Sequence, residues 1–274
     1  MTENTKSVSQ LSCPYCFSTD SFKFLSKGKW MFLCHDCQRY LPVSKAKFKE
    51  VETTTTQVNY TSVLQLCTKI SDLPSDHFCR QYVEKRKIPT EFHSELYFTE
   101  NFAKLAEFAQ KDIPNEPRLV IPFFNKQKKL FALQGRALTP SKQRYITIVY
   151  NKEEELIYGL DRADESKDLI CVEGPIDSLF IKNGIAAAGS GGLSHKYSPT
   201  TIICLDNEPR NREIVSKNKK YLENKFRVVI WPASVSEKDI NDMVLRGINV
   251  EKIIKENTFS GINGTLKLGS WKKV

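Results

Sequence analysis

The 274-residue sequence lacks any long apolar run, and no segment approaches the roughly 20 apolar residues that a membrane-spanning helix needs. Its first twelve residues, MTENTKSVSQLS, also lack the apolar core of a signal peptide. The glycine-rich segment GSGGLSHK does not end in the glycine-lysine-serine/threonine triplet of a P-loop, so we expect no ATP-driven motor. These absences predict a cytoplasmic protein that does not span a membrane.

The charge of the chain is unbalanced, with 41 Lys and Arg against 32 Asp and Glu and a formal net charge of +9. Such a surplus favours a polyanionic partner, although charge alone does not separate a nucleic acid from a membrane surface. The length allows one large domain or a small module joined to a larger one.

The eight cysteines of the chain fall into two groups. Disulfides are rare in the cytoplasm, so we expect thiols or metal ligands. Four cysteines lie within apolar patterns and are expected in the core: Cys67, Cys79, Cys171 and Cys204. The other four form the pairs CPYC and CHDC, seventeen residues apart.

Paired C-x-x-C turns suit tetrahedral zinc because each turn directs two thiolates at one ion. The strands FKFL and WMFLC, joined by SKGK, form a predicted hairpin that brings the pairs together. A structural Zn²⁺ is therefore predicted at Cys13, Cys16, Cys34 and Cys37. In the same hairpin, Trp30 beside Lys29 is suited to stacking on unpaired bases.

Between this module and the acidic segments, the pattern changes from polar to helical and then to extended. Residues 44–60 are a predicted polar linker, and residues 61–112 are predicted to be mainly helical through SVLQLCTKI, DHFCRQYVEKRKI and NFAKLAEFAQKD. The basic run EKRK within them is most simply a solvated face. The runs RLVIPFFN, LFALQGRAL and RYITIVY then predict antiparallel strands.

Basic residues stand where these strands end or turn: Arg118, Lys126, Arg136, Lys142, Arg144 and Lys152. Lysines at strand edges commonly prevent edge-to-edge pairing and need no further role. Arg136 differs because it follows Gly135 inside an otherwise apolar strand. We expect this cation to have a partner.

Acidic residues follow three predicted strands in the C-terminal half. Glu173 follows DLICV and precedes a predicted helix, PIDSLFIKNG, which is expected to close at Gly184. Asp206 and Glu208 end TTIICLDNE, and the segment KDIND follows FRVVIW. Ligands bind at the carboxyl ends of strands in open α/β sheets, so these acids predict a metal site. Any one of them alone fits a simple helix cap.

These motifs resemble those of the TOPRIM-type DNA primases of bacteria and tailed phages. That family's signature is a glutamate after a hydrophobic strand and a two-acid motif one strand later, which correspond to Glu173 in VEGPIDSL and to Asp206 and Glu208 in LDNE. Upstream, LVIPFFNKQKKLFALQGRAL, QRYITI and LIYGL are similar to family segments, and the zinc ribbon stands at the family's separation. The likeness runs from Ser12 to about Gly247 and is strongest to primases of T-even-type phages.

The resemblance implies an α/β fold, α+β overall, in which a small zinc ribbon precedes a mixed α+β subdomain joined to a Rossmann-like parallel TOPRIM sheet. The implied boundaries are 1–43 for the zinc ribbon, 44–60 for the linker, 61–160 for the basic subdomain, 161–257 for the TOPRIM subdomain and 258–274 for a basic tail.

The resemblance also assigns roles. Catalytic ligands of Mg²⁺ or Mn²⁺ would be Glu173, Asp206, Glu208 and Asp239, supported by Gly174, Asp177 and Asp242. Nucleotide or template would be bound by Arg118, Arg136, Lys142, Arg144 and Lys152. The chain departs from many relatives where Glu208 replaces a second aspartate and where Arg144 replaces a lysine.

The implied activity is synthesis of short RNA primers on single-stranded DNA from ribonucleoside triphosphates. Implied partners are a separate hexameric replicative helicase and a single-stranded DNA-binding protein, in the cytoplasm of a bacterial host and with no membrane. Two alternatives share the pattern. A TOPRIM nuclease would use the same metals but would not need the basic segment around Gly135 and Arg136. A recombination mediator would only bind DNA, but it would place a helix-hairpin-helix before the zinc site, where only twelve residues precede Cys13.

Overall fold

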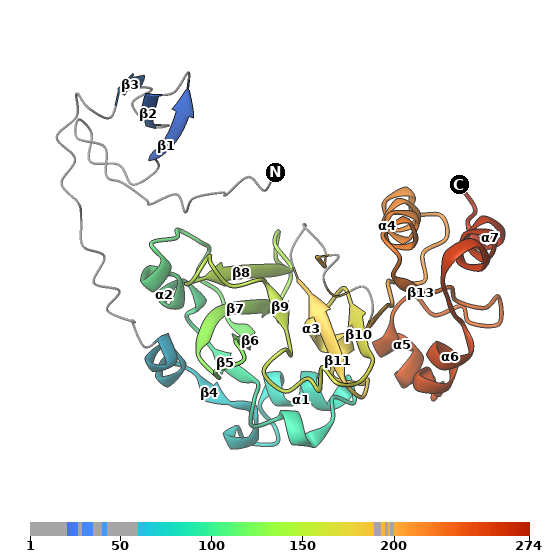
Figure 1. The fold of residues 1–274 in the computed structure, drawn as a ribbon. Coiled ribbons are helices and arrows are strands. Elements are labelled where there is room, and N and C mark those ends of the chain that lie inside the picture. The colour runs from blue at the N-terminus through green and yellow to red at the C-terminus, as the bar shows by residue number, and fades with distance from the viewer. Residues whose placement is uncertain are drawn as a thin grey trace. The chain divides into compact units, whose positions relative to one another are not determined.

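The computed structural model describes residues 21–26, 29–34, 40–42, 60–188, 193–194, 197 and 200–274. The chain divides into two compact units, Met1–Val58 and Asn59–Val274, which are described separately (Figure 1). In the described residues, no helix has the length and apolar character required to cross a membrane.

The first unit contains a three-stranded antiparallel sheet in the order β1-β2-β3. Its strands are β1 (Ser21–Ser26), β2 (Lys29–Cys34) and β3 (Tyr40–Pro42). The β1–β2 pairing confirms the predicted hairpin. Phe32 and Cys34 are buried, whereas Trp30 is about half exposed at 49%. The predicted zinc ligands Cys13, Cys16 and Cys37 and the predicted linker up to residue 59 lie outside the described residues.

The second unit begins with a five-stranded antiparallel sheet in the order β4-β5-β6-β7-β8. Its strands are β4 (Thr68–Lys69), β5 (Tyr97–Thr99), β6 (Arg118–Phe124), β7 (Leu130–Ala137) and β8 (Tyr145–Val149). The three long strands match the predicted runs. Every residue of β7 is buried, because this strand lies between β6 and β8 and is covered on both faces.

A six-stranded sheet follows, in the order β14-β13-β12-β10-β11-β9. Its members are β9 (Ile157–Tyr158), β10 (Leu169–Val172), β11 (Gly184–Ala187), β12 (Thr201–Ile203), β13 (Arg227–Val229) and β14 (Thr258–Phe259). The four central strands are parallel, and β9 and β14 are antiparallel edges. This arrangement confirms the predicted α/β class with a parallel sheet.

Helices flank both sheets (Figure 1). The α-helices are α1 (Phe78–Lys85), α2 (Phe102–Ala106), α3 (Pro175–Ser178), α4 (Arg212–Glu223), α5 (Ile240–Leu245), α6 (Val250–Glu256) and α7 (Gly261–Trp271). Short 3₁₀ helices are η2 (Tyr60–Leu66), η3 (Ile70–Asp72), η4 (Thr90–Phe92) and η5 (Glu107–Ala109). Side chains of Asn211, Asp239 and Asn249 accept backbone N–H bonds at the starts of α4, α5 and α6, as N-caps do.

Four predicted elements differ in the structure. The helix predicted over NFAKLAEFAQKD is the short α2, continued by the 3₁₀ helix η5. The helix predicted over SVLQLCTKI is the 3₁₀ helix η2, after which the chain extends to pair β4 with β5. The helix predicted to close at Gly184 ends at Ser178. Turns follow, with Asn183 at a φ of +59°, and Gly184 begins β11. The C-terminal tail, which was predicted only as basic and without an assigned element, forms α7, which packs on α4.

Candidate catalytic site

The predicted acids meet at one edge of the parallel sheet. Glu173 directly follows β10, and Asp206 stands three residues after β12, the strand paired with β10. Asp239 closes the loop after β13 and caps α5 by accepting a hydrogen bond from the Asp242 N–H at 2.8 Å. Since β10, β12 and β13 are parallel neighbours, their carboxyl ends deliver these side chains to the same edge.

Asp206 shows that the acids lie close enough to interact. Burial, together with the negative charges of Glu173, Asp177 and Asp239, raises the pKa of the Asp206 carboxyl to about 7. The Lys238 ammonium opposes this shift without cancelling it. A site with this much uncompensated negative charge favours the binding of a cation.

Asp177, one helical turn beyond Glu173, belongs to the same group. Its Oδ1 accepts a hydrogen bond from the Asn241 N–H at 3.0 Å, and burial and the Asp239 charge raise its pKa to about 6. Gly174 makes room for this carboxylate, because a Cβ at residue 174 would lie 3.0 Å from Asp177 Oδ2. Asp177 therefore orients the start of α5 instead of capping its own helix.

Two lysines face the acids. Lys238 Nζ lies 3.3 Å from Glu208 Oε1 and 3.9 Å from Asp206 Oδ2, and Lys217 Nζ lies 3.3 Å from Glu173 Oε1. As the side chains lie, no group of three or more His, Cys, Asp or Glu residues in the described part of the chain is arranged to hold a metal ion. The donors nevertheless suit magnesium, which prefers carboxylate oxygens, and the half-exposed Lys238 can move aside on its flexible stem.

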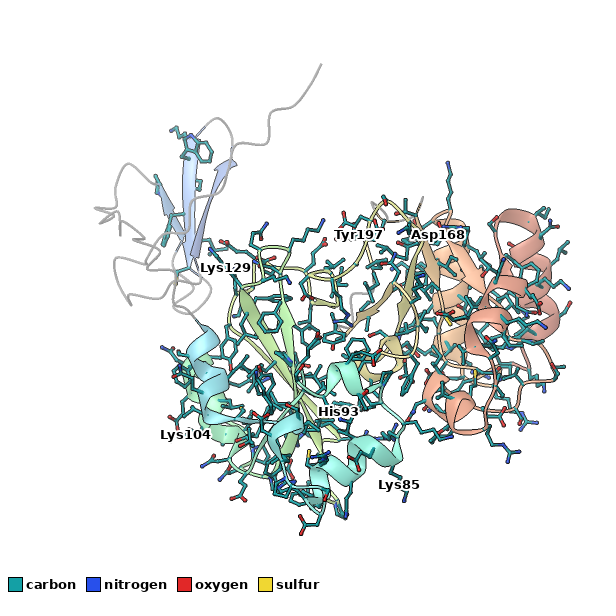
Figure 2. The ribbon with its side chains drawn as sticks, turned by 90° about the horizontal axis from the view of Figure 1, so that it is seen from below. Lys85, His93, Lys104, Lys129, Asp168 and Tyr197 are labelled. Carbon is teal, nitrogen blue, oxygen red and sulfur yellow. The ribbon has the colours of Figure 1, made fainter. Side chains whose placement is uncertain are left out.

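Helix α1 connects the acids at the edge of the six-stranded sheet to the part of the unit that holds the five-stranded antiparallel sheet. Arg86 follows α1, and its Nη1 donates to Asn241 Oδ1 at 2.5 Å, while Asn241 Nδ2 donates to the Arg86 carbonyl at 2.7 Å. In Figure 2, Lys85 at the end of α1 lies on the side of the C-terminal helices, where this contact is made. The basic run EKRK is thus not only a solvated face.

A cluster of alternating arginines and tyrosines extends from Arg86. The Arg86 guanidinium lies 5.2 Å from the Tyr82 ring centroid. The Arg136 guanidinium lies 5.8 Å from the same ring and 4.8 Å from the Tyr145 ring, and that of Arg144 lies 5.9 Å from Tyr145. We call these five residues the Arg–Tyr cluster. Cation–π contacts hold the guanidinium groups without neutralising their charge.

Arg136 is the central member of this cluster and is only 8% exposed. Its Nε and Nη1 have no hydrogen-bond partner among the described residues, and neither does the buried Tyr82 hydroxyl. Gly135 precedes it because any Cβ there would lie 2.4 Å from the Phe102 ring. A buried guanidinium without a full set of acceptors is costly, so Arg136 is suited to an anionic ligand.

Arg118 occupies a different environment. Its side chain is fully buried, pairs with Glu116, and donates from Nη1 to the Gly135 carbonyl at 2.7 Å and from Nη2 to the Gln143 carbonyl at 2.8 Å. These partners tie β6 to β7 and to the following loop. The observed position supports a structural role for Arg118 instead of nucleotide binding.

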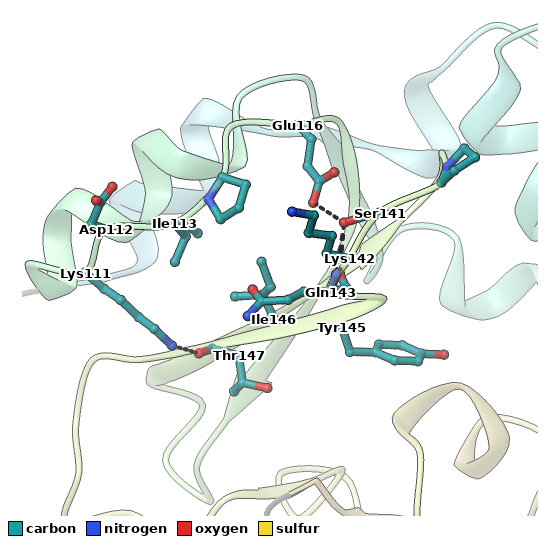
Figure 3. Close-up of a pocket in the computed structure, with 12 residues that line it drawn as sticks. Lys111, Asp112, Ile113, Glu116, Ser141, Lys142, Gln143, Tyr145, Ile146 and Thr147 are labelled. Carbon is teal, nitrogen blue, oxygen red and sulfur yellow. Dashed lines mark hydrogen bonds between the residues drawn. The ribbon is translucent and has the colours of Figure 1, made fainter.

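Lys142 and Lys152 are both exposed. Lys142 lines a pocket of about 760 Å³ between the segment before β6 and the edge strand β8 (Figure 3). In the pocket, Lys111 Nζ donates to the Thr147 carbonyl at 2.9 Å, and Tyr145 of the Arg–Tyr cluster lies at the rim. Lys152 lies in the turn after β8. The pocket therefore adjoins the positively charged cluster.

Several residues of the site carry no sequence signal of their own. Tyr82 and Arg86 lie one helical turn apart at the end of α1, whereas Asn241 comes from a distant segment that only the fold brings to them. Lys217 lies on α4 among other lysines, and Lys238 begins the acidic segment KDIND, yet both lie beside carboxylates in space. A search for paired cations near the acid motifs would have found only Lys238, which directly precedes Asp239.

Comparison with known proteins shows which proteins the chain resembles in sequence and in fold. The chain is 37% identical over 224 residues to the DNA primase of Enterobacteria phage T4, an alignment that covers 77% of this chain. The chain is therefore similar in sequence to a phage DNA primase. It spans 65% of the length of that phage primase. No protein-family model matches the sequence.

Solved primase structures share the fold. The DnaG primase catalytic domain bound to single-stranded DNA superposes with a TM-score of 0.58 at 18% identity, covering 74% of this chain and 79% of that one. The Aquifex aeolicus primase, with its zinc-binding and RNA polymerase domains, gives a TM-score of 0.52 at 14% identity and covers 93% of this chain and 81% of that one. The chain thus resembles the phage T4 primase in sequence and these two primase structures in fold.

Proposed function

We propose that the chain is a DNA primase that synthesises short RNA primers on a single-stranded DNA template. The observation that carries this proposal is the arrangement of one edge of the parallel sheet, where carboxylates from three strand ends meet beside the Arg–Tyr cluster. Acids suited to divalent cations and cations suited to phosphates are the two requirements of nucleotidyl transfer. The relationship to the phage T4 primase supports the same conclusion.

In this proposal, Glu173, Asp206, Glu208 and Asp239 hold Mg²⁺ or Mn²⁺. Cations bound there would supply the charge that neutralises the triphosphate and lowers the pKa of the attacking 3′-hydroxyl. Lys238 and Lys217 hold the carboxylates in place by ion pairs until the cations bind. Asp177 keeps the start of α5, and with it Asp239, in position through the Asn241 N–H.

The Arg–Tyr cluster would bind phosphates of the template or of the incoming nucleotide. Arg136 is held between the rings of Tyr82 and Tyr145, so its orientation is set before a ligand arrives. Arg144 and Lys142 are exposed nearby and add positive charge without the same fixed geometry. Lys152, which was predicted to act with them, lies beyond the other end of β8, where the Asn151 N–H donates to the Phe131 carbonyl. Arg118 would stabilise the strands that carry Arg136.

The N-terminal unit would read the template. We propose that Cys13, Cys16, Cys34 and Cys37 bind a structural Zn²⁺ and that the exposed Trp30 stacks on an unpaired base. The proposed division of the chain is a zinc ribbon at 1–43, a linker at 44–60, a basic subdomain at 61–160, a catalytic subdomain at 161–257 and a tail at 258–274. A separate hexameric helicase and a single-stranded DNA-binding protein would be its partners, in the cytoplasm of a bacterial host.

The test is a primer-synthesis assay with purified chain, single-stranded DNA, labelled ribonucleotides and Mg²⁺ or Mn²⁺. We expect short RNA products that disappear with a chelator and in Glu173→Gln. DNA cleavage without RNA would indicate the nuclease alternative instead. Binding of DNA with neither product, even with a cognate helicase present, would indicate a recombination mediator.

A further inference from the structure

Asn207, between the two acids of the LDNE segment, fastens two loops of the site together. Its Nδ2 donates to the carbonyls of Val235 at 2.9 Å and Glu237 at 3.1 Å. Its backbone N–H donates to the Lys238 carbonyl at 2.7 Å. Since Lys238 immediately precedes Asp239, these bonds fix the loop after β12 relative to the loop that carries the third acid.

The C-terminal helix supplies the remaining partner of this side chain. Trp271, the last residue of α7, donates from Nε1 to Asn207 Oδ1 at 3.3 Å. Just beyond it, the Lys273 N–H donates to the Pro209 carbonyl at 2.8 Å. The end of α7 is therefore bonded on both sides of Glu208, at Asn207 and at Pro209.

Packing alone does not hold this loop. A pocket of about 550 Å³ lies beside it, and its lining includes Asn207, Trp231, Pro232, Phe259, Lys267 and Trp271. A loop with a hollow on one side can shift unless directional bonds prevent it. The hydrogen bonds of Asn207 and Trp271 cross this region, together with those from Trp231 Nε1 to the Leu205 carbonyl at 2.8 Å and from the Lys273 N–H to the Pro209 carbonyl.

The helix itself is anchored elsewhere. Leu268 of α7 and Leu222 of α4 are both buried in the same apolar cluster, and the two helices lie against each other. Removing the indole donor of Trp271 would therefore leave α7 docked. Because the packing of α7 does not depend on the hydrogen bond from Trp271 to Asn207, the effect of losing that bond can be measured on its own.

We propose that Asn207 and Trp271 are positioning residues that make the C-terminal helix part of the metal site. They act by holding Asp206 and Glu208 in the geometry that binds a divalent cation. This inference rests on the proposed function of those two carboxylates as metal ligands. It gives the tail a role in catalysis without any contact between the tail and the substrate.

The experiment is a titration of the full chain with Mn²⁺ alone, followed by electron paramagnetic resonance of the free ion. Trp271→Phe, which keeps the packing and removes the donor, should weaken Mn²⁺ binding roughly 3- to 10-fold. Asn207→Ala, which removes three side-chain bonds, should weaken it about 10- to 100-fold. Ile262→Ala, on the same helix and 77% exposed, is the control and should bind Mn²⁺ as the wild type does.

Primer synthesis is the second measurement. Both variants should require more Mn²⁺ for half-maximal activity and show a lower kcat, with an unchanged KM for ribonucleotides, and Trp271→Phe should keep the wild-type melting temperature. Unchanged Mn²⁺ affinity in folded Trp271→Phe and Asn207→Ala would overturn the positioning role alone. A wild-type chain that fails to bind Mn²⁺ would overturn the proposed metal site as well.

Discussion

Arg86 and Asn241 exchange two hydrogen bonds although they stand 155 positions apart in the sequence. The guanidinium donates to the amide oxygen, and the amide nitrogen donates to the Arg86 carbonyl. Asn241 is 1% exposed, and its backbone N–H also donates to Asp177. The side chain and the backbone N–H of one buried residue thus join α1 and its Arg–Tyr cluster to the acidic residues at the sheet edge.

Asn241→Ala should lower the free energy of unfolding by about 1–3 kcal/mol, because the Arg86 carbonyl and guanidinium lose partners in a buried setting. It should also slow primer synthesis by releasing the start of α5. Urea unfolding measures the first effect. Glu84→Ala, which breaks an exposed pair with Arg80 on α1, is the control and should change stability by less than about 1 kcal/mol. Equal losses in the two variants would contradict the assigned role of Asn241.

Asp206→Asn should stabilise the metal-free protein at pH 8. The folded-state pKa of about 7 lies above the ordinary aspartate value of about 3.9, so the folded state keeps a proton that the unfolded state releases. The contribution of Asp206 to stability is therefore greatest below about pH 4 and is lost as the pH rises to about 7. Asparagine stays neutral at every pH and does not lose this stability. At pH 8 the free energy of unfolding of Asp206→Asn should therefore exceed that of the wild type by on the order of 1–3 kcal/mol.

Thermal unfolding in the presence of a chelator measures this difference. The gain from Asp206→Asn should shrink as the pH is lowered toward 4, where both side chains are neutral. The same variant should bind Mn²⁺ weakly and make no primers. A variant less stable than the wild type at pH 8 would show that the acids do not repel one another.

Arg136→Gln should weaken binding of single-stranded DNA by roughly 10-fold, because the central guanidinium of the Arg–Tyr cluster is lost. The slope of log affinity against log salt should also decrease by about 1. Fluorescence anisotropy with a labelled oligonucleotide measures both. Lys126→Gln is the matched control, because Lys126 is exposed and pairs with Glu165. An unchanged affinity in Arg136→Gln would remove this cluster from the DNA-binding surface.

The purified chain should contain one zinc ion, as elemental analysis would show, and Cys37→Ser should lose it. Cys67→Ser should keep the metal, because burial raises the pKa of the Cys67 thiol to about 12 and leaves it protonated. Zinc loss should spare the unit Asn59–Val274, which has its own core. Retention of zinc in Cys37→Ser would mean that other ligands bind it.

The acids at the strand ends were predictable because their signal is local. A short apolar run followed by a carboxylate specifies both the buried strand and the edge at which Glu173 and Asp206 emerge. The hairpin of the first unit was predictable for the same reason. Patterns of this kind depend on neighbours in the sequence, and the structure preserves them.

Burial and long-range pairing were not predictable in this way. Arg118 and Arg136 both stand in apolar strands, yet both terminal nitrogens of Arg118 donate to carbonyls and only its Nε lacks a partner, whereas Nε and Nη1 of Arg136 have none among the described residues. Helix α7 contains three glycines, each of which costs about 1 kcal/mol relative to alanine, so its local propensity argues against a helix. The packing of Leu268 in the apolar core outweighs that cost. No pattern within the segment predicts this contact.

Primer synthesis by the wild-type chain and by Glu173→Gln tests most directly whether the acids at the strand ends bind the metal of a primase. Single-stranded DNA, labelled ribonucleotides and Mg²⁺ are supplied, and the products are resolved by length. The wild type should make short RNA only when metal is present, and Glu173→Gln should make at least about 100-fold less while still binding DNA. Full activity in Glu173→Gln would contradict the role of Glu173 as a metal ligand. The absence of RNA from the wild type, even with Mn²⁺ and a cognate helicase, would contradict the primase function.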